Sequence, residues 1–402
     1  MLFVAITVLL DMIAIGLIFP VLPHLVGTMT DSARDQAVWF GLLGLAFGLA
    51  NFVGAPVLGA LSDRYGRRPV LLLGIGGLAL SFFVTAAATA LWVLVVVRLF
   101  SGAVQANAAV ANAYVADIST ADDRARRFGI IGAMFGLGFT LGPVIGGLLG
   151  AIDIHLPFYA AGTLALLNWA YGWFVLPESL PADRRKPFEW RRAHPFAAWA
   201  GLARLKGVGP LVLAIALSSL AQLSLHTSWV LYTKFKFGWG PAEVGWSLFT
   251  VGLMAALVQG VMLRHVLARV SPRALVSFGL VSGALMYLCF GLASAGWMIY
   301  ATIVMGNLLS GGTQAAMNSL VSNAADSREQ GSTMGALASL SSVMAVTAPV
   351  ISAALLGLVA ERPQGDMLIG LPMFFSALLQ ATAAAVAIAY FRRPTPVAPA
   401  AA

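Results

Sequence analysis

The stretch GALSDRYGRRPVL (residues 59–71) decides the fold of this chain. It places Asp63, Arg64, Arg67 and Arg68 within six residues, and on both sides the sequence is free of charge for more than twenty residues. Hydrophobic residues make up 59% of the 402 residues and charged residues only 10%, whereas a soluble domain carries about 25% charged residues. So little charge cannot cover a water-exposed surface, so the chain needs the lipid bilayer as a second solvent.

Apolar segments recur along the whole chain. A membrane-spanning helix needs about 20 apolar residues. The sequence therefore predicts an all-α, polytopic membrane protein with twelve transmembrane helices. The predicted spans are 3–23, 38–61, 70–90, 92–116, 128–151 and 157–176 in the first half, and 210–233, 242–264, 273–294, 296–323, 331–357 and 367–391 in the second.

The positions of Lys and Arg predict the orientation of these helices. Of the 24 Lys and Arg residues, 19 lie in the even-numbered connections and at the chain ends, four lie in the odd-numbered connections, and Arg98 lies inside a span. Because cytoplasmic loops carry an excess of Lys and Arg, both termini are expected in the cytoplasm. Membrane orientation then explains the net charge of +8, and no nucleic-acid partner is expected.

The longest connection, LPESLPADRRKPFEWRRAHPF, separates two groups of six spans. Its Trp, Phe and Arg residues suggest that it lies along the cytoplasmic membrane surface. We expect an N-terminal six-helix half over 1–176, a cytoplasmic linker over 177–209, a C-terminal half over 210–391 and a cytoplasmic tail over 392–402.

The two halves resemble each other in sequence. RLFSGAVQA, which begins at Arg98, recurs as NLLSGGTQA from Asn307, and PVIGGLLG from Pro143 recurs as PVISAALLG from Pro349. These matches occur in order and at nearly one offset, which indicates duplication of a six-helix unit. Repeated halves around a site at the membrane midplane are a frequent plan of secondary transporters.

Three motifs carry a resemblance to the major facilitator superfamily. GALSDRYGRRP resembles the signature loop between helices two and three, RLFSGAVQANAAVANAYVADIS resembles a second signature, and GLGFTLGPVIGG resembles the element found in the family's antiporters. The resemblance implies a cytoplasmic latch that bridges the two halves in the outward-facing state. The latch residues are Gly59, Asp63, Arg64, Gly66, Arg67, Arg68 and Asp117, and the antiporter motif comprises Gly138, Gly142, Pro143, Gly146 and Gly147. We also expect Gly59 and Gly66 to allow close backbone approach and a tight turn.

A closer resemblance is to the tetracycline/proton antiporter group of drug exporters, carried by LDMIAIGLIFPVLP from Leu10 and by KFGWGPAEVGWSL. That group carries acidic residues in helices three and nine and a histidine in helix eight. Here the corresponding positions hold Ser81, Gly283 and Ala255. The departure favours a general drug exporter with a simpler proton route.

Two charges lie well inside predicted spans, Asp11 in the first and Arg98 in the fourth. A charge near the bilayer centre costs ~3 kcal/mol or more, so one that is retained points to function. We expect Asp11 to be the proton-coupling carboxylate and Arg98 to be its electrostatic partner or relay. The alternative is a permanent structural ion pair between them. Weaker candidates line the expected substrate cavity or bridge helices: Asn51, Gln105, Asn112, Gln222, His226, Gln314 and Asn318.

These features favour a proton-coupled antiporter that exports lipophilic drugs by alternating access. The alternative is a proton-coupled uptake symporter for a small polar metabolite, but few charges and many Met, Phe and Trp favour lipophilic cargo. Enzyme motifs, metal-ligand clusters and phosphate-binding loops are absent from the sequence, so no enzyme activity, cofactor or metal is expected. We expect a monomer in the bacterial inner (cytoplasmic) membrane, with a small lipophilic substrate, protons and the lipid bilayer as its partners.

Overall fold

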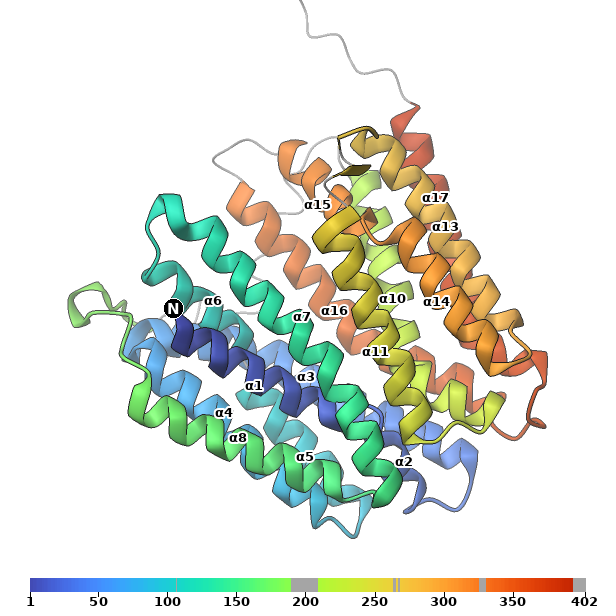
Figure 1. Ribbon diagram of the computed structural model, residues 1–402, viewed down its shortest axis with the longest axis horizontal. Coiled ribbons are helices and arrows are strands. Elements are labelled where there is room, and N and C mark those ends of the chain that lie inside the picture. The colour runs from blue at the N-terminus through green and yellow to red at the C-terminus, as the bar shows by residue number, and fades with distance from the viewer. Residues whose placement is uncertain (106, 189–208, 263–264, 267, 325–329, 393–402) are drawn as a thin grey trace, which may run out of the picture.

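The computed structural model describes residues 1–105, 107–188, 209–262, 265–266, 268–324 and 330–392, and every regular element within them is a helix (Figure 1). The first group of helices is α1 (Leu2–Ile18), α2 (Leu22–Gly27), α3 (Ala33–Tyr65), α4 (Arg67–Ala86), α5 (Leu91–Val104), α6 (Asn107–Asp117), α7 (Ala121–Ile152) and α8 (Leu156–Val175). After the short η1 (Ala182–Arg184), the second group is α10 (Gly209–Phe237), α11 (Pro241–Leu257), η2 (Val258–Met262), α13 (Pro272–Leu292), α14 (Gly296–Ser310), α15 (Thr313–Ala324), α16 (Gln330–Gly357), η3 (Met367–Gly370) and α17 (Leu371–Phe391).

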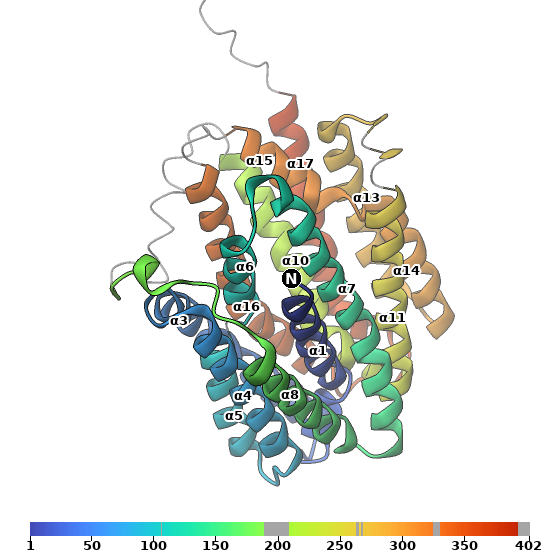
Figure 2. The same cartoon turned by 60° about the vertical axis from the view of Figure 1, so that its left-hand side comes forward.

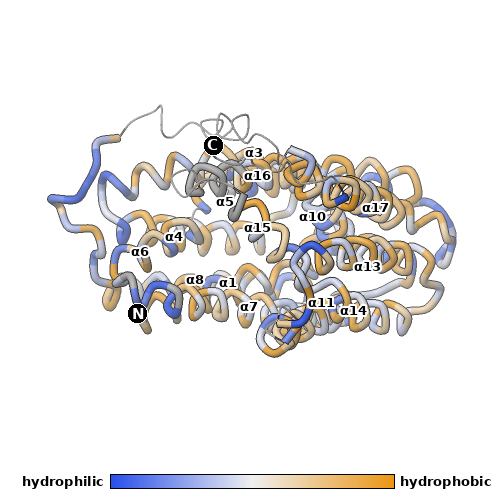
Figure 3. Tube along the Cα trace, turned by 90° about the horizontal axis from the view of Figure 1, so that it is seen from above, coloured by the Kyte–Doolittle hydropathy of each residue, from blue (hydrophilic) through white to orange (hydrophobic). Residues whose placement is uncertain are grey.

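A helix covers each of the twelve predicted spans, which agrees with the predicted all-α polytopic fold. Ten helical segments of the described chain are long and apolar enough to cross a membrane. The other two predicted spans are α8, which carries Asn168 among several Trp and Tyr residues, and the broken pair α14–α15. In Figure 3 the hydrophobic stretches run along the helices, while the hydrophilic stretches gather mainly near their ends.

The predicted boundaries of two spans are too short. α3 begins at Ala33 rather than at 38, and α7 begins at Ala121 rather than at 128. In each case a hydroxyl caps the helix outside the apolar run, because Ser32 Oγ accepts from the amide of the third residue after it and Thr120 Oγ1 does the same. Such caps stabilise a helix start, so both helices extend beyond the segments that hydropathy marks.

Three predicted spans are interrupted, which corrects the prediction of continuous helices. The span over 3–23 breaks at residues 19–21, between α1 and α2. The other two are 92–116 and 296–323. Of these two, the first breaks between α5 and α6, where Gln105 has φ −88° and ψ 75°. The second breaks at residues 311–312, between α14 and α15. Both breaks lie in the repeated sequences SGAVQA and SGGTQA. Broken helices are tolerated at membrane depth where the protein satisfies the freed backbone groups.

Each group of helices has apolar cores of its own. Leu17, Leu78 and Phe158 belong to a core of the first group, and Leu211 and Leu280 belong to a core of the second. The half boundaries predicted at 176/177 and 209/210 stay a prediction, because residues 189–208 of the linker and 393–402 of the tail lie outside the described chain.

The two groups meet along two helix pairs, α7 with α11 and α3 with α16. Figures 1 and 2 both show α11 running beside α7. Glycines make these contacts close: a Cβ at Gly147 would lie 2.4 Å from Pro241 O, and one at Gly41 would lie 2.2 Å from Ala353 Cβ. Small residues let membrane helices approach at backbone distance, so these glycines define the interface.

The interface is tight at only one end of the molecule. We call this the closed end; it carries the connections at 28–32 and 153–155. There Lys234 Nζ donates to Gln36 Oε1 at 2.9 Å, and His24 Nε2 lies 3.3 Å from Trp239 O. The opposite end, with the turn between α3 and α4, is called the latch end. A Cβ would meet nothing within 4 Å in the described chain at six glycines of this end: Gly59, Gly129, Gly132, Gly136, Gly209 and Gly260. The two groups are therefore separated there.

This difference predicts opposite effects for two substitutions on one helix. Gly147→Val should loosen the closed end, because the new Cβ clashes with the backbone of α11 and overpacking costs about 1–3 kcal/mol. Gly132→Val should leave the closed end unchanged, because a Cβ there meets nothing. Spin labels at the exposed Ile152 and Trp297, in a Cys289→Ser background, would report the distance across the closed end. Equal distance distributions for both variants would contradict the assignment of this interface.

Candidate functional site

The turn between α3 and α4 requires a glycine at residue 66. Gly66 has φ +107°, in the region that side chains disfavour, and a Cβ there would lie 2.2 Å from Glu178 Oε2. The predicted tight turn at this glycine is therefore present. Gly59 lies within α3 and has open space around it, so the close approach expected there is absent in this conformation.

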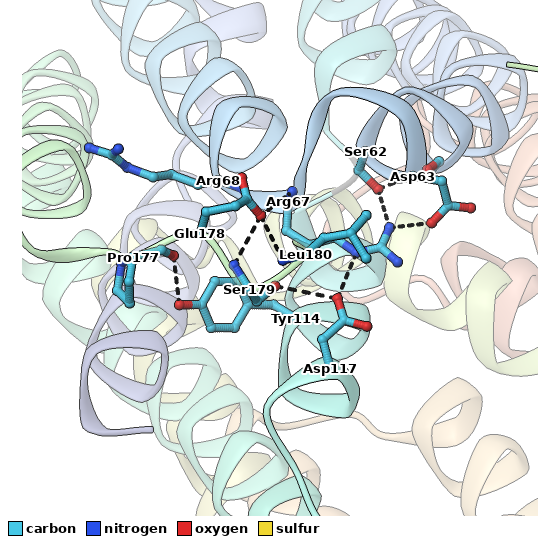
Figure 4. A network of polar contacts seen from close by, with 11 residues as sticks. Ser62, Asp63, Arg67, Arg68, Tyr114, Asp117, Pro177, Glu178, Ser179 and Leu180 are labelled. Atoms are coloured by element: carbon cyan, nitrogen blue, oxygen red, sulfur yellow. Dashed lines mark hydrogen bonds and ion pairs between the residues drawn. The ribbon is translucent and has the colours of Figure 1, made fainter. Parts of the chain in front are cut away.

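The carboxylate of Glu178 covers the start of α4. Glu178 Oε1 accepts from the backbone amide of Arg67 at 2.8 Å, and its Oε2 accepts from that of Arg68 at 3.3 Å. The same carboxylate accepts from the amides of Ser179 and Leu180, each at 3.0 Å (Figure 4). The first amides of a helix lack intrahelical partners and attract negative charge. Glu178 therefore caps α4 from a distant part of the chain.

The Arg67 side chain ties three helices together at the same place. It is 9% exposed, and its Nη1 contacts Asp63 Oδ1 at 2.5 Å and Ser62 Oγ at 2.6 Å on α3. Its Nε donates to Asp117 Oδ2 at 3.0 Å on α6. Ser179 Oγ also donates to this carboxylate, at 3.3 Å. The structure thus brings together Asp63, Arg67 and Asp117, three of the predicted latch residues.

Two further latch residues lie at the edge of this network. Arg68 Nη2 donates to Trp173 O at the end of α8. Arg64 is exposed, and its guanidinium lies 5.0 Å from the ring centre of Tyr65. The described partners of the network all lie on α3, α4, α6, α8 and residues 177–186. The predicted bridge between the two halves is therefore not formed in this conformation, in which the latch end is separated.

Sequence reasoning missed several members of this network: Ser62, Tyr114, Glu178 and Ser179. Tyr114 Oη donates to Pro177 O at 2.8 Å. Glu178 lies at the start of the long connection between the two groups of spans, and nothing in the sequence indicates that it faces α4.

Asp11 occupies a small pocket near the middle of α1. It is 3% exposed, and Asn107 Nδ2 donates to its two carboxylate oxygens at 3.3 and 3.2 Å. The rest of the pocket lining is apolar except for Thr7: Val4, Val8, Met12, Leu71, Ile75, Ala111, Phe135 and Leu176. Asn107 is the first residue of α6, directly after the helix break. Because its side chain is uncharged, hydropathy alone does not distinguish it from the other polar residues nearby.

Arg98 does not contact Asp11 in this conformation. Its guanidinium lies 5.9 Å from the ring centre of Phe47 on α3. Arg98 lies on α5 and Asn107 begins α6, beyond the helix break, and their side chains contact different neighbours, Phe47 and Asp11. A direct Asp11–Arg98 ion pair is therefore not present here, and the role of Arg98 in proton coupling stays a prediction.

The predicted cavity residues divide into two groups. Asn51 Nδ2 donates to Gly102 O at 3.3 Å and to Gln105 O at 2.7 Å, so Asn51 satisfies the carbonyls freed by the helix break. These contacts favour bridging roles for Asn51 and Gln105. The others do not line the Asp11 pocket, and most are exposed: Asn112, Gln222, His226, Gln314 and Asn318. A substrate cavity lined by them stays a prediction.

The antiporter-like motif packs α7 against two helices at once. A Cβ at Gly138 would lie 2.6 Å from Met12 Cβ, and one at Gly146 would lie 1.9 Å from Leu17 O, both on α1. Gly142 faces α1 in the same way, while Pro143 O and Gly147 contact α11. α7 therefore links the helix that carries Asp11 to α11 of the second group.

Comparisons with known proteins show which family and which proteins this chain is similar to. The family model of the Major Facilitator Superfamily matches residues 4–349 and 211–401. The chain is 37% identical over 350 residues to the class C tetracycline resistance protein of Escherichia coli, covering 87% of each chain. It is 34% identical over 396 residues to the class D protein of Salmonella ordonez, covering 97% of this chain and 96% of that protein. The solved nucleoside transporter NupG superposes with a TM-score of 0.78 at 14% identity, covering 98% and 99% of the two chains.

The cap at the start of α4 predicts a loss of stability when its charge is removed. Glu178→Gln keeps the size of the side chain but weakens its hydrogen bonds to four backbone amides. Hydrogen bonds to charged groups contribute about 1.5–3 kcal/mol, so we expect a loss of that order in the free energy of unfolding. Thermal unfolding of the detergent-solubilised protein would measure it, with Glu361→Gln at an exposed glutamate as the matched control. Equal unfolding temperatures for the two variants would show that the cap contributes nothing.

Proposed function

The chain belongs to the major facilitator superfamily, and we propose that it exports a lipophilic, tetracycline-like compound in exchange for protons by alternating access. The observation that carries the proposal is Asp11, a carboxylate buried inside a membrane-spanning helix and held by the amide of Asn107. The names of the most similar relatives support a drug as cargo and favour export over uptake symport.

Asp11 is suited to exchange because its environment favours neither charge state completely. An ionised carboxylate at membrane depth is costly, whereas the two contacts from Asn107 stabilise the ionised form. A proton removes the charge, and substrate or water that enters beside the carboxylate changes the balance again. Proton binding and substrate binding then oppose each other, which is the basis of antiport.

The packing of α7 connects this site with the interface between the two groups of helices. α1 contacts α7 through Gly16 and Gly142, and α7 contacts α11 through Gly147 and Gly245. A shift of α1 that follows the charge state of Asp11 therefore reaches the interface through one intervening helix. This short connection supports coupling between protonation and the change of access.

The departures from the tetracycline group shape the proposed proton route. Ser81 is buried, and its hydroxyl donates to Leu78 O on its own helix. Gly283 packs against Gln380, and Ala255 lies on α11. With no acidic side chain at these positions, Asp11 is the coupling carboxylate and Arg98 a fixed positive charge on α5.

The orientation follows from the same proposal. The latch end, which gathers most of the Lys and Arg residues, lies in the cytoplasm together with both termini. The chain is then an inward-open monomer in a bacterial inner membrane, and Asp63, Arg67 and Asp117 form the latch of the opposite, outward-facing state.

Everted membrane vesicles test the function directly. With an acidic interior, vesicles that contain the wild-type protein should accumulate tetracycline, and Asp11→Asn should abolish this gradient-driven uptake while tetracycline binding persists. Asp31→Asn, at an exposed aspartate of the closed end, is the matched control and should transport normally. Normal uptake by Asp11→Asn would remove Asp11 from the mechanism, and no uptake by the wild type would argue against this cargo.

The latch makes a separate prediction. Asp63→Asn should weaken the outward-facing state by ~1–3 kcal/mol, the scale of a lost charged hydrogen bond, and so shift the population toward the conformation described above. Spin labels at the exposed Arg124 and Arg273 would follow the distance across the latch end. If that distance distribution stays the same while substrate is turned over, Asp63 has no role as a latch.

A further inference from the structure

The break between α5 and α6 lies next to the buried carboxylate. α5 ends at Val104, and Asn107, the first residue of α6, donates to the two carboxylate oxygens of Asp11 at 3.3 and 3.2 Å. The carbonyls at the end of a helix lack intrahelical partners. The residues that bond to these carbonyls therefore decide where α6 begins and where the Asn107 side chain lies.

Asn51 on α3 bonds to the carbonyls of this break. Its Nδ2 donates to Gln105 O at 2.7 Å and to Gly102 O at 3.3 Å. Gln105 has left helical geometry, with φ −88° and ψ 75°, and precedes Asn107 by two residues. A polar group left unpaired inside a protein is costly, so the break would rearrange without the Asn51 amide.

Close contact between α3 and α5 fixes Asn51 against the break. A Cβ at Gly102 would clash with Phe47 O, and one at Gly54 would clash with Ala103 O. The two backbones therefore touch on both sides of Asn51. With so little space between the helices, the Asn51 amide stays at the carbonyls to which it bonds.

Asn107 is confined on its other side by α4. A Cβ at Gly74 would clash with Asn107 Oδ1, so the amide fills the space between α4 and Asp11. The pocket around Asp11 is lined by residues of α1, α4, α6 and α7 and by Leu176, and apart from Asp11 none of them is titratable or charged. A small displacement of the Asn107 amide therefore changes the main polar influence on this carboxylate.

We propose that Asn51 is a positioning residue for proton exchange at Asp11. By holding the break, Asn51 keeps the Asn107 amide against the carboxylate, and that amide stabilises the ionised form. The proposal deepens the proposed function and rests on it, because it takes Asp11 as the proton-coupling carboxylate. α3 also contacts α16 about one turn before Asn51, where a Cβ at Gly48 would lie 3.3 Å from Ala345 O. A movement at this interface therefore reaches Asp11 through Asn51.

The break in the second group of helices provides an internal comparison. It lies in the repeat of the same sequence, where Ala316 corresponds to Asn107. There the amide of Gly311 bonds to Asn307 O of its own helix at 2.9 Å. The broken helix is thus common to both halves, whereas the amide that reaches a carboxylate belongs to the first.

An infrared titration tests the proposal without any cargo. The carbonyl stretch of a protonated carboxyl group would be followed in the detergent-solubilised full-length protein, and subtraction of the Asp11→Asn spectrum would assign the band. Asn107→Ala should move the midpoint to higher pH by about 1–2 units, the scale of a lost hydrogen bond to a charged group. Asn51→Ala should move it in the same direction by less. Asn51→Gln keeps the amide donor and should restore most of the wild-type midpoint.

A double variant decides whether Asn51 acts through Asn107. In the Asn107→Ala background, Asn51→Ala should cause no further shift, because residues that act on one another are not additive. Ser282→Ala is the matched control, because Ser282 Oγ lies 3.4 Å from Leu309 O beside the second break, and its midpoint should equal that of the wild type.

Four results would overturn the proposal: an unchanged midpoint in Asn51→Ala, equal shifts in Asn51→Ala and Asn51→Gln, additive shifts in the double variant, or an equal shift in Ser282→Ala. Asn51→Leu replaces Asn51→Ala if the latter does not fold, because it fills the space of the amide without its hydrogen bonds.

The outcomes also separate this proposal from the proposed function. If the midpoints shift as expected but vesicles with the wild-type protein take up no tetracycline, the proposed function fails and the positioning of Asp11 by Asn51 stands. If uptake depends on Asp11 while Asn51→Ala leaves the midpoint unchanged, the function stands and the positioning role fails.

Discussion

The arrangement of this protein depends on the close approach of α7 to two helices at once. Glycines four residues apart on one side let α7 touch the backbone of α1, and Gly147 on another side lets it touch α11. Without hydrophobic driving force between helices in lipid, such packing is a main source of association. The helix with the buried carboxylate and the helix of the other group are thereby held one helix apart.

Much of the fold follows from the sequence because the bilayer leaves few choices. Backbone groups in lipid must be satisfied within helices, so an apolar run of sufficient length predicts a span. The capped starts of α3 and α7 escaped this reasoning, since Ser32 and Thr120 lie outside the apolar runs. The helix breaks escaped it as well, because they depend on tertiary partners such as Asn51.

The candidate site was also predictable only in part from the sequence. Asp11 and the cluster around Asp63 and Arg67 were predictable because charge is rare in this chain and therefore conspicuous. Their partners were not. Asn107 is an ordinary polar residue whose importance comes from the pocket it faces, and Glu178 is distant in sequence from the helix it caps. Three-dimensional proximity between uncharged or distant residues leaves no signature in a single sequence.

The glycines of the latch end that contact no other helix in this conformation bear on the free-energy difference between conformations. Gly129, Gly132 and Gly136 continue along α7 the kind of surface that Gly147 already uses at the other end, and Gly59 and Gly260 add similar bare backbone on α3 and η2. Rocking the two groups would exchange one glycine-lined contact for another of the same kind. Because one contact replaces another of the same kind, we expect the two states to differ little in free energy, so the glycine contacts by themselves would hold the molecule in neither state.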